Sequence, residues 1–336
     1  MKNTHIQLSH GAGGRQTQSL IQEIFAKAFE NPNIDTMNDG AVLDWESDQI
    51  VMTTDSFVVD PVFFPGGDIG KLAVCGTVND LAVMGAKPLY LSVGFILEEG
   101  FQIADLERIV KSMRTVADEA GVSIVTGDTK VVQKGKADGV FINTAGVGKR
   151  ITKDRIGADQ VQTGDAILLT GPIGSHGMAV LSARGDLGLE GELISDVAPL
   201  NGLIESLLTA SVNIHAMRDA TRGGVATVLN EIAEASEVEI VVDESSIPVS
   251  EAVESACMIL GFEPLYIANE GVLVIILPDS LADEAIEIIR MNQYGKSAVK
   301  IGEVREGAKG RVQLRTTIGS HRILDMRSGE QLPRIC

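Results

Sequence analysis

The sequence predicts an α/β protein with mixed sheets (α+β in part), divided into two domains. Its 336 residues exceed one average domain of about 100–200 residues. Segments with helical spacing of apolar residues alternate along the chain with short Val- and Ile-rich runs that are typical of strands. Residues 148–165 are polar and repeatedly interrupted by Gly, and we interpret them as the boundary between the domains.

Composition narrows the class of protein. Hydrophobic residues make up 44% of the chain, and 36 Gly with only 10 Pro exclude a Pro/Gly-dominated disordered chain. The 28 Lys+Arg and 46 Asp+Glu give a net charge of −18, which argues against nucleic-acid binding. The apolar runs, such as 272–277, are far too short to span a membrane, and the N-terminal residues lack the apolar core of a signal peptide. With three cysteines and no disulfide framework, we expect a cytoplasmic protein.

The first half of the chain predicts an N-terminal segment followed by a mixed domain. Residues 1–38 contain a Gly-rich stretch, 11–14, and an amphipathic helix with apolar residues at 20, 21, 24, 25, 28 and 29, which Asn31-Pro32 ends. Strands are expected at 41–45, 49–54, 122–127 and 140–148, and a helix at 105–120, which Gly121 stops. We assign residues 39–155 to the N-terminal domain.

The second half predicts a C-terminal α/β domain, 156–320. Strands are expected at 166–171, 238–243 and 272–277, and helices from Gly177 and at 224–236, 249–260 and 281–291. Residues 321–336 are polar, and we interpret them as a mobile tail that ends in Cys336. Fully extended, this tail spans up to roughly 50 Å, against a radius of gyration of about 20 Å, so its last residue could reach a distant site.

Two glycine stretches are candidate phosphate sites. The chain has no GxxxxGK[ST] motif, which excludes the simple P-loop interpretation. Residues 65–70 and 171–177 each lead into a helix, where backbone N–H groups can hold an anion. For either stretch alone, glycines that serve only a turn are the stronger interpretation.

Carboxylates at the ends of predicted elements form a second candidate site. Asp39, Asp55, Asp80 and Asp128 recur through one domain next to glycines, and several such groups together favour Mg²⁺ bridging to phosphates. Each one taken singly is better explained as a solvated turn or a helix cap. Asp219 and Arg222 precede a helix and Glu270 precedes a strand, so capping and turn roles stay open for them too.

Cys336 stands out because it is the last residue. With 3 Cys in 336 residues, chance places one there about 1% of the time. The position does not fit a prenylation box, whereas an accessible thiol can be acylated or can carry a group between sites. An ordinary surface thiol is an equally good explanation of this feature alone. The histidines do not pair with Cys at zinc-finger spacing.

Together these motifs resemble the hydrogenase-maturation carbamoyl dehydratases of the HypE family. The resemblance runs from end to end: LSHGAGG, TTDSFVVDP, FFPGGDIGKLAVCGTVNDLAVMGA, GFILEEG, VTGDTKVVQ, FINTAG, DATRGG, ANEG and the closing PRIC. PRIC and GDTK are the specific segments. NDLAVMGA is shared more widely with the superfamily of aminoimidazole ribonucleotide synthetase, selenophosphate synthetase and thiamine-monophosphate kinase.

The resemblance implies a two-domain fold like that of aminoimidazole ribonucleotide synthetase, which dimerises through N-domain strands with ATP near that interface. It implies a carbamoyltransferase of the HypF family that loads the Cys336 thiol. ATP-dependent dehydration then yields a thiocyanate, and the cyano group passes to iron on a scaffold of the HypC and HypD families, for the [NiFe]-hydrogenase active site.

The resemblance also suggests roles for particular residues. The expected cofactors are ATP and Mg²⁺, with Mg²⁺ on the four aspartates named above, and those aspartates together with Lys71, Asp219 and Arg222 lining the ATP site. Phosphoryl transfer needs positioning and charge neutralisation, which such groups supply. Removing N–H protons needs a base, either Lys130 or Glu270, in surroundings that bring its pKa towards neutrality.

Two other functions remain open. A kinase or synthetase of the same superfamily acting on a free small molecule would have no need of Cys336. A non-catalytic carrier that only presents a thiol-bound group would consume no ATP and would tolerate Asp80→Ala. Cys75 and Cys257 lie in apolar helical segments and are expected to be structural.

Overall fold

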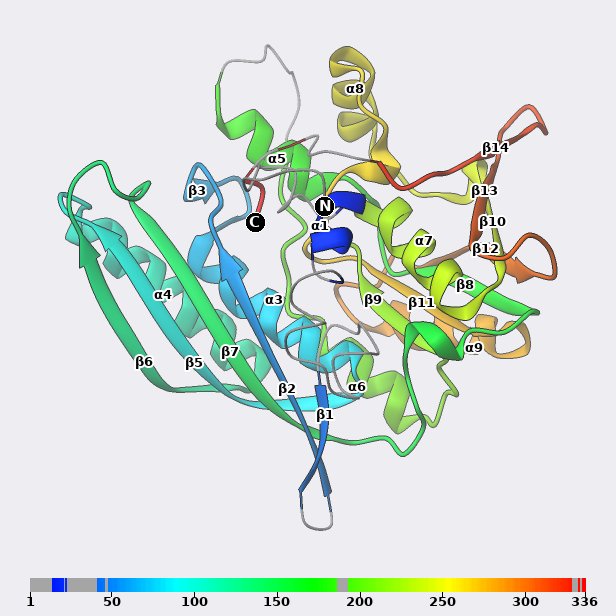
Figure 1. Ribbon diagram of the computed structural model, residues 1–336, viewed down its shortest axis with the longest axis horizontal. Helices are drawn as coiled ribbons and strands as arrows, with labels where there is room; N and C mark the ends of the chain where they lie inside the picture. Colours follow the sequence, from blue (N-terminus) through cyan, green and yellow to red (C-terminus); the bar gives the residue numbers. More distant parts are fainter. Residues whose placement is uncertain are drawn as a thin grey trace.

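The computed structural model describes residues 14–20, 22, 41–45, 48–185, 193–327, 332 and 334–336. It confirms a two-domain α/β fold with mixed sheets (Figure 1). In the described residues the first sheet has the order β1 (Ala41–Trp45), β2 (Asp48–Phe57), β7 (Val140–Arg150), β5 (Ala86–Glu98) and β6 (Ser123–Val132). Only β5 and β6 pair in parallel. A short hairpin, β3 (Phe63–Phe64) and β4 (Gly67–Asp68), follows β2.

The two faces of this sheet differ in character. Along β2, Val51, Thr53 and Phe57 are buried, whereas the alternate residues are exposed, which is the period of two that a half-covered strand requires. The helices α3 (Ile69–Val83) and α4 (Ile103–Ala120) cover the buried face, here called the inner face, and lie behind the sheet in Figure 1. The opposite face is called the outer face.

The helix α3 joins the two domains. Its sequence is apolar on all sides, and nearly all of its residues are buried, as expected for a helix enclosed by other elements. Asn79 within it donates a hydrogen bond to Ala198 O (3.1 Å) and accepts one from Leu200 N (2.7 Å). These paired bonds satisfy a buried amide and tie α3 to the second half of the chain.

The second sheet has helices on both faces. Its order in the described residues is β14 (His321–Ile323), β13 (Arg311–Arg315), β10 (Glu239–Asp243), β12 (Val299–Arg305), β8 (Asp165–Leu169), β11 (Leu273–Pro278) and β9 (Ala216–Asp219). The helices α6 (Asn201–Thr209) and α9 (Ala282–Met291) pack on one face, and α7 (Gly224–Ser236) packs on the other. The helices α5 (Ser175–Ala183) and α8 (Glu251–Leu260) lie near the C-terminus of the chain (Figure 1). Short 3-10 turns complete the domain: η3 (Ala158–Gln160), η4 (Glu244–Ser246), η5 (Pro264–Tyr266) and η6 (Asp279–Leu281).

Most elements expected from periodicity are confirmed, with ends that shift by a few residues. The expected helix at 224–236 coincides with α7, and the one at 105–120 begins two residues earlier as α4. The pattern did not predict β5, α6, β9, β12 or β13. Of the expected helix at residues 20–29, most lies outside the described residues; α1 spans Arg15–Leu20.

The segment expected as a tail from residue 321 begins as part of the second sheet. Residues 321–323 form β14, and Leu324 beyond it is fully buried. The side chains of β14 are exposed, which hides the strand from a hydrophobic pattern, because its position is held by backbone pairing with β13. Across the described ranges, no helix is both long and apolar enough to cross a membrane.

Asp68→Ala is expected to destabilise the fold by about 1–2 kcal/mol. The Asp68 carboxylate caps α3 by accepting from Gly70 N (2.8 Å) and Lys71 N (3.0 Å), and it also accepts from Ser112 Oγ (2.9 Å) on α4. Urea unfolding of the variant measures the loss. Ser250→Ala is the control, because Ser250 caps α8 through one longer bond to Val253 N (3.3 Å) and should cost less. Equal losses for the two variants would contradict this account of Asp68.

Candidate active site

Four segments that are distant in sequence meet where the two domains join. They are the end of β2, the loop 219–224 between β9 and α7, the loop 268–271 before β11, and the last residues of the chain. Asn269 connects two of these loops, because its side chain and its backbone N–H both donate to Ala220 O (2.8 and 3.0 Å). Glycine permits the close approach at this point: a Cβ on Gly224 would lie 2.6 Å from Leu265 O.

Asp55 and Asp80 lie on the inner side of the sheet. Asp80 of α3 accepts from Thr53 Oγ1 of β2 (3.0 Å), and Asp55 is two residues further along the same face of β2. Asp55 Oδ2 is 3.7 Å from the position that a Cβ on Gly76 would occupy, one helical turn before Asp80. The same Cβ would lie 2.9 Å from Phe57 Cζ, so the glycine makes room for the Phe57 ring, whereas the Asp55 carboxylate is at ordinary contact distance from α3.

Arg222 lies within the electrostatic reach of these acids and of the chain end. Negative charge at Cys336 is the main cause of the raised pKa of the Arg222 guanidinium. Partial burial acts in the opposite direction, and the carboxylates of Asp55, Glu270 and Asp80 raise this pKa further. A guanidinium placed among such groups is suited to hold a phosphate or a charged tail.

Glu270 is a buried acid with an unused oxygen. Only 3% of the residue is exposed, and its Oε1 has no hydrogen-bond partner among the described residues. Burial raises the pKa of Glu270 well above its ordinary value, and the negative charges of Asp219, Asp196 and Asp55 add to this effect, while Arg222 opposes it. A carboxylate whose pKa is raised binds a proton more tightly than an ordinary carboxylate, which is the property that a general base requires.

Asp196 holds the loop that carries Glu270. Its Oδ2 accepts from Glu270 N (3.1 Å) and Gly271 N (2.9 Å). Burial raises the pKa of Asp196 to about 6, against the lowering effect of these backbone hydrogen bonds. Nothing in the residue pattern around Asp196 separates it from an ordinary loop acid, so the sequence analysis missed it.

The last residues of the chain are docked against the end of β2. Val58 N donates to Cys336 O, and Asp60 N donates to Arg334 O, both at 3.1 Å, so the chain end runs along residues 58–60. Ile335 is buried, and the Cys336 side chain is partly exposed. The end of the chain therefore lies at the site that the same chain forms. Val58, which bonds Cys336, comes three residues after Asp55 in the sequence.

Asp128 and Lys130 are not brought to this site within one chain. Both lie on β6, three strands away from β2, a separation of about 14 Å. The register pairs Asp128 through β5 and β7 with Ser56, which points to the outer face, whereas Asp55 points to the inner face. The two side chains are about 70% exposed and bind each other, with Lys130 Nζ 3.0 Å from Asp128 Oδ2. Within one chain, Lys130 is therefore an exposed side chain paired with an acid rather than a buried one.

Three further residues were expected to bind ATP or Mg²⁺, and each has a different position or role. Asp39 lies outside the described residues. Lys71 is at the first turn of α3, roughly 13 Å along the helix axis from Asp80, and its Nζ donates to Gly66 O (3.0 Å). Asp219 ends β9 and acts on Glu270 through its charge.

Both glycine stretches have backbone N–H groups that are already bonded within the protein. Asp68 accepts from the first amides of α3, as described above. Gly174 N donates to the buried Asn269 Oδ1 (2.6 Å), and Gly177 N donates to Ala268 O (3.0 Å). In this structure the second stretch connects α5 to the loop that carries Glu270, which is a packing role.

The residues at the site can supply only some of the ligands that a Mg²⁺ ion needs. Across the described residues, no group of three or more His, Cys, Asp or Glu side chains is arranged to hold a metal ion. Asp55, which lies beside Gly76 of α3, and Asp80, one turn further along α3, nevertheless supply hard carboxylate oxygens. Mg²⁺ is commonly held by one or two carboxylates together with substrate phosphates, so these two side chains fit it.

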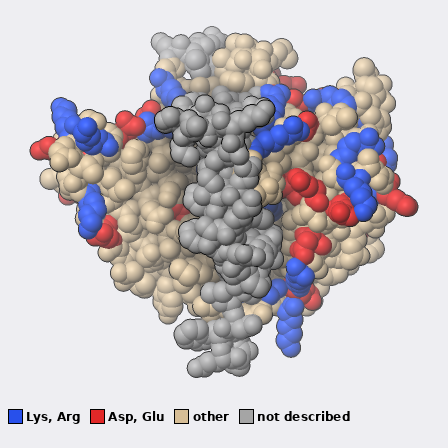
Figure 2. Space-filling view, in the orientation of Figure 1, with Lys and Arg blue, Asp and Glu red and all other residues tan. Residues whose placement is uncertain are grey.

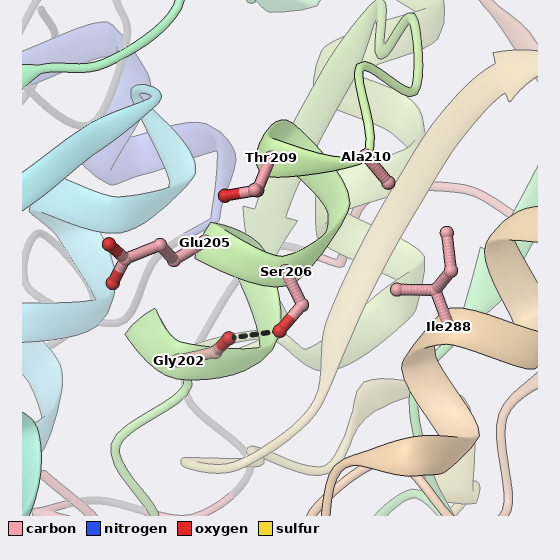
Figure 3. A pocket seen from close by; sticks show the side chains of 6 residues that line it. All are labelled: Gly202, Glu205, Ser206, Thr209, Ala210 and Ile288. Carbon is pink, nitrogen blue, oxygen red and sulfur yellow. Dashed lines mark hydrogen bonds between the residues drawn. The ribbon is translucent and has the colours of Figure 1, made fainter.

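A surface hollow elsewhere contains none of the expected site residues. It is open, has a volume of about 550 Å³, and lies between α6 and α9. Figure 3 shows its lining, including the bond from Ser206 Oγ to Gly202 O (2.9 Å).

The two internal cysteines are buried as expected: burial raises the pKa of Cys257 to about 11 and raises that of Cys75 further, so both are poor nucleophiles.

Known protein families match the chain over both halves. The family model of the AIR synthase related protein N-terminal domain matches residues 37–150, and that of the C-terminal domain matches residues 162–315. A thiamine monophosphate kinase from Aquifex aeolicus has the same fold at 18% identity, with a TM-score of 0.66 over 92% of this chain and 99% of that chain. The fold is that of the AIR synthase related proteins.

More similar relatives narrow this class. The carbamoyl dehydratase HypE of Azotobacter vinelandii is 49% identical over all of this chain and 98% of its own length, and that of Escherichia coli K12 is 48% identical over 99% of both. A crystal structure of hydrogenase maturation protein HypE in complex with ATP is 48% identical, with a TM-score of 0.84 over 99% of this chain and 100% of that chain. A HypE–HypF complex gives 51% identity and a TM-score of 0.87 over 92% of this chain and 100% of that one. The chain belongs to the HypE family of hydrogenase-maturation carbamoyl dehydratases, which confirms the resemblance.

Proposed function

We propose that the protein dehydrates a carbamoyl group carried on the Cys336 thiol to a thiocyanate, using ATP. The carbamoyl oxygen takes the γ-phosphoryl group and leaves as phosphate, because hydroxide alone is a poor leaving group. Two N–H protons are removed, and the C–N bond becomes C≡N. Overall, R–S–CO–NH₂ and ATP give R–S–C≡N, ADP and phosphate.

The observation that carries this proposal is the docked position of Cys336. A kinase acting on a free molecule has no use for a chain end that is bonded to Val58, three residues after Asp55 in the sequence, and lies within the electrostatic reach of Arg222. A relative of known structure binds ATP, which supports ATP as the phosphoryl donor here. Cys336 is only partly exposed, which limits the access of water to a group carried on its thiol.

The residues around Cys336 suggest a division of roles. Glu270, buried and with Oε1 unused, removes an N–H proton from the carbamoyl group. Arg222 orients phosphate and neutralises charge that develops on it. Asp55 and Asp80 hold Mg²⁺, which supplies charge neutralisation when bound. Asp219 supports the raised pKa of Glu270.

A second copy of the chain is proposed to cover the outer face of the first sheet. Met52, Val147 and Tyr90 form one row across this face, and Met52 and Tyr90 are 48% and 52% exposed. Figure 2 shows few charged side chains over the middle of this sheet, beside the grey residues. Asp128 and Lys130 share the outer face, so a dimer formed here would place them at the interface, where the HypE family resemblance locates ATP.

The partners follow from the reaction. A HypF-type carbamoyltransferase loads Cys336, and a known structure pairs a relative of this chain with HypF. The HypC and HypD scaffold receives the cyano group for iron of the [NiFe] site. We place this assembly in the cytoplasm.

Mass spectrometry of the C-terminal peptide tests the function. The protein is loaded with a carbamoyltransferase and carbamoyl phosphate, divided into samples with and without Mg-ATP, and cleaved after Glu330. Carbamoyl on Cys336 should lose the mass of one water only when ATP is present, and Cys336→Ser should show no thiocyanate at all. Cys257→Ser is the control, because that thiol is buried and should leave the reaction intact.

Two outcomes would contradict the proposal. Loading without water loss would leave a non-catalytic carrier of the carbamoyl group. No loading, together with ATP hydrolysis that depends on a free small-molecule acceptor, would indicate a kinase or synthetase of the same superfamily.

A further inference from the structure

Each of the last three residues of the chain has its backbone oxygen held by a donor from the body of the protein. Cys336 O accepts from Val58 N (3.1 Å), and Arg334 O accepts from Asp60 N (3.1 Å). Ile335 O accepts from the imidazole Nε2 of His176 (2.9 Å). Two of these donors are backbone groups, which any sequence would supply, whereas His176 donates through its side chain and bonds the residue directly before Cys336.

His176 is placed so that its ring has one orientation and one protonation state. The residue is on α5, is fully buried, and packs edge-on against Phe64, with ring centroids 5.3 Å apart. Ile335 O can only accept, so Nε2 must carry the proton. Nδ1 then accepts from Ser195 Oγ (2.8 Å), and Ser195 Oγ in turn accepts from Val197 N (3.1 Å). Burial lowers the pKa of His176 to about 4, so the ring is neutral at pH 7.

The bond to Ile335 O acts directly on Cys336. The carbonyl of Ile335 and the amide nitrogen of Cys336 belong to one planar peptide group. A donor that fixes this carbonyl therefore fixes the plane from which the Cys336 side chain projects. The same helix also ends beside the chain end, because Arg184 at its C-terminus donates through Nη2 to Arg334 O (2.6 Å).

We propose that His176 is a positioning residue that docks the chain end and so holds the Cys336 thiol in the site. Its role rests on the proposed dehydration, for which the thiol must be held at the site, whereas loading by a partner needs the thiol outside it. The residue touches neither the thiol nor the expected phosphates. It acts through the Ile335 carbonyl alone.

The first readout is independent of the reaction. Full-length protein is treated with iodoacetamide over time, cleaved after Glu330, and the alkylation rate of Cys336 is measured, with the buried Cys75 and Cys257 as internal references. His176→Phe removes the donor and leaves a buried carbonyl unbonded, so Cys336 should react roughly ten-fold faster. Ser195→Ala leaves the ring free to adopt the other tautomer, which would turn a lone pair towards Ile335 O, so it should give a smaller increase.

The second readout separates positioning from a general structural role. After loading, single-turnover dehydration should be about ten-fold slower in His176→Phe, whereas the loading rate by the carbamoyltransferase should not fall. His176→Gln keeps an N–H donor and should restore part of the loss. His215→Phe is the matched control, since His215 is another largely buried histidine, bonded to Asp165 far from the chain end, and it should leave Cys336 alkylation unchanged.

The outcomes distinguish this inference from the proposed function. Unchanged Cys336 alkylation in folded His176→Phe and Ser195→Ala would overturn the role of His176, whatever the reaction. Faster alkylation in a protein whose parent shows no ATP-dependent water loss would retain the docking role and remove the dehydratase. If His176→Phe does not fold, His176→Gln and Ser195→Ala decide the matter by the same alkylation rates.

Discussion

Glu270→Gln is expected to slow the dehydration of carbamoylated Cys336 by about 10²–10⁴-fold while leaving loading unchanged. The substitution keeps the shape of a buried side chain and removes its ability to take a proton. Burial and three neighbouring acids raise the pKa of Glu270, so the parent rate should increase with pH up to that raised pKa and then level off. The residual rate of the variant should lack this rise. Single-turnover dehydration measured from pH 5 to pH 9 provides the comparison.

Glu270→Gln should slow the reaction, but it should stabilise the folded protein relative to the parent as pH rises. The pKa of Glu270 in the folded state is raised above its ordinary value of 4.5, so the folded protein binds the proton more tightly than the unfolded chain. This contribution to stability is present at low pH and is lost as pH rises from about 4.5 through the raised folded-state pKa. The stability of Glu270→Gln relative to the parent should therefore increase over that range, as measured by urea unfolding at several pH values.

Glu205→Gln is the control for both measurements. Glu205 is on α6 at the surface, where it pairs with Lys87, and it lies outside the site. This variant should match the parent in rate and in the pH dependence of unfolding. If Glu270→Gln dehydrated carbamoylated Cys336 as fast as the parent, Glu270 would be excluded as the base. Lys130 would then be the remaining candidate.

Gly271→Ala is expected to destabilise the fold by about 3 kcal/mol and to slow dehydration about 100-fold. A Cβ at this position would lie 1.8 Å from Asp196 O and 2.8 Å from Asp196 C, which are both backbone atoms. Neither can rotate away, so the loop 268–271 must move. That movement would displace Glu270 and its backbone bond to Asp196 Oδ2.

Gly185→Ala is the matched control, because none of the residues that the structure describes has an atom within 4 Å of the added Cβ, and the φ of Gly185 is outside the left-handed region. It should change the free energy of unfolding by only a few tenths of a kcal/mol. Urea unfolding and single-turnover dehydration of both variants test the difference. A Gly271→Ala protein with the stability and rate of the parent would show that the close approach to Asp196 is not needed for the site.

Periodicity was a good guide wherever an element has one buried face. α4 and α7 were predicted almost residue for residue, because apolar residues recur along one side of each helix and Gly121 ends α4 in the left-handed conformation. β14 was missed because its exposed side chains leave no alternating pattern, and only its backbone pairs with β13.

The sequence predicted several residues of the site, but it did not predict which of the selected residues lie close together in the fold. Asp55, Asp80, Arg222, Glu270 and Cys336 were selected from motifs, and the structure brings them together. Asp128 and Lys130 were selected in the same way but lie on the opposite face of the sheet, because the register across three strand pairs decides which side a residue faces. His176 and Asp196 were missed, since they act through contacts with backbone groups, one for His176 and two for Asp196, and such contacts have no sequence pattern.

The sequence by itself determined the class of fold, the family and the unusual thiol at Cys336, because these depend on residue types and on their local spacing. The tertiary structure decided which of those residues meet. It bonded Cys336 to Val58 within the electrostatic reach of Arg222, buried Glu270 among other acids and put His176 against Ile335, which is 159 residues away along the chain. Such contacts depend on how two domains pack around α3, and that packing is set by many weak apolar contacts distributed over the chain rather than by any single motif.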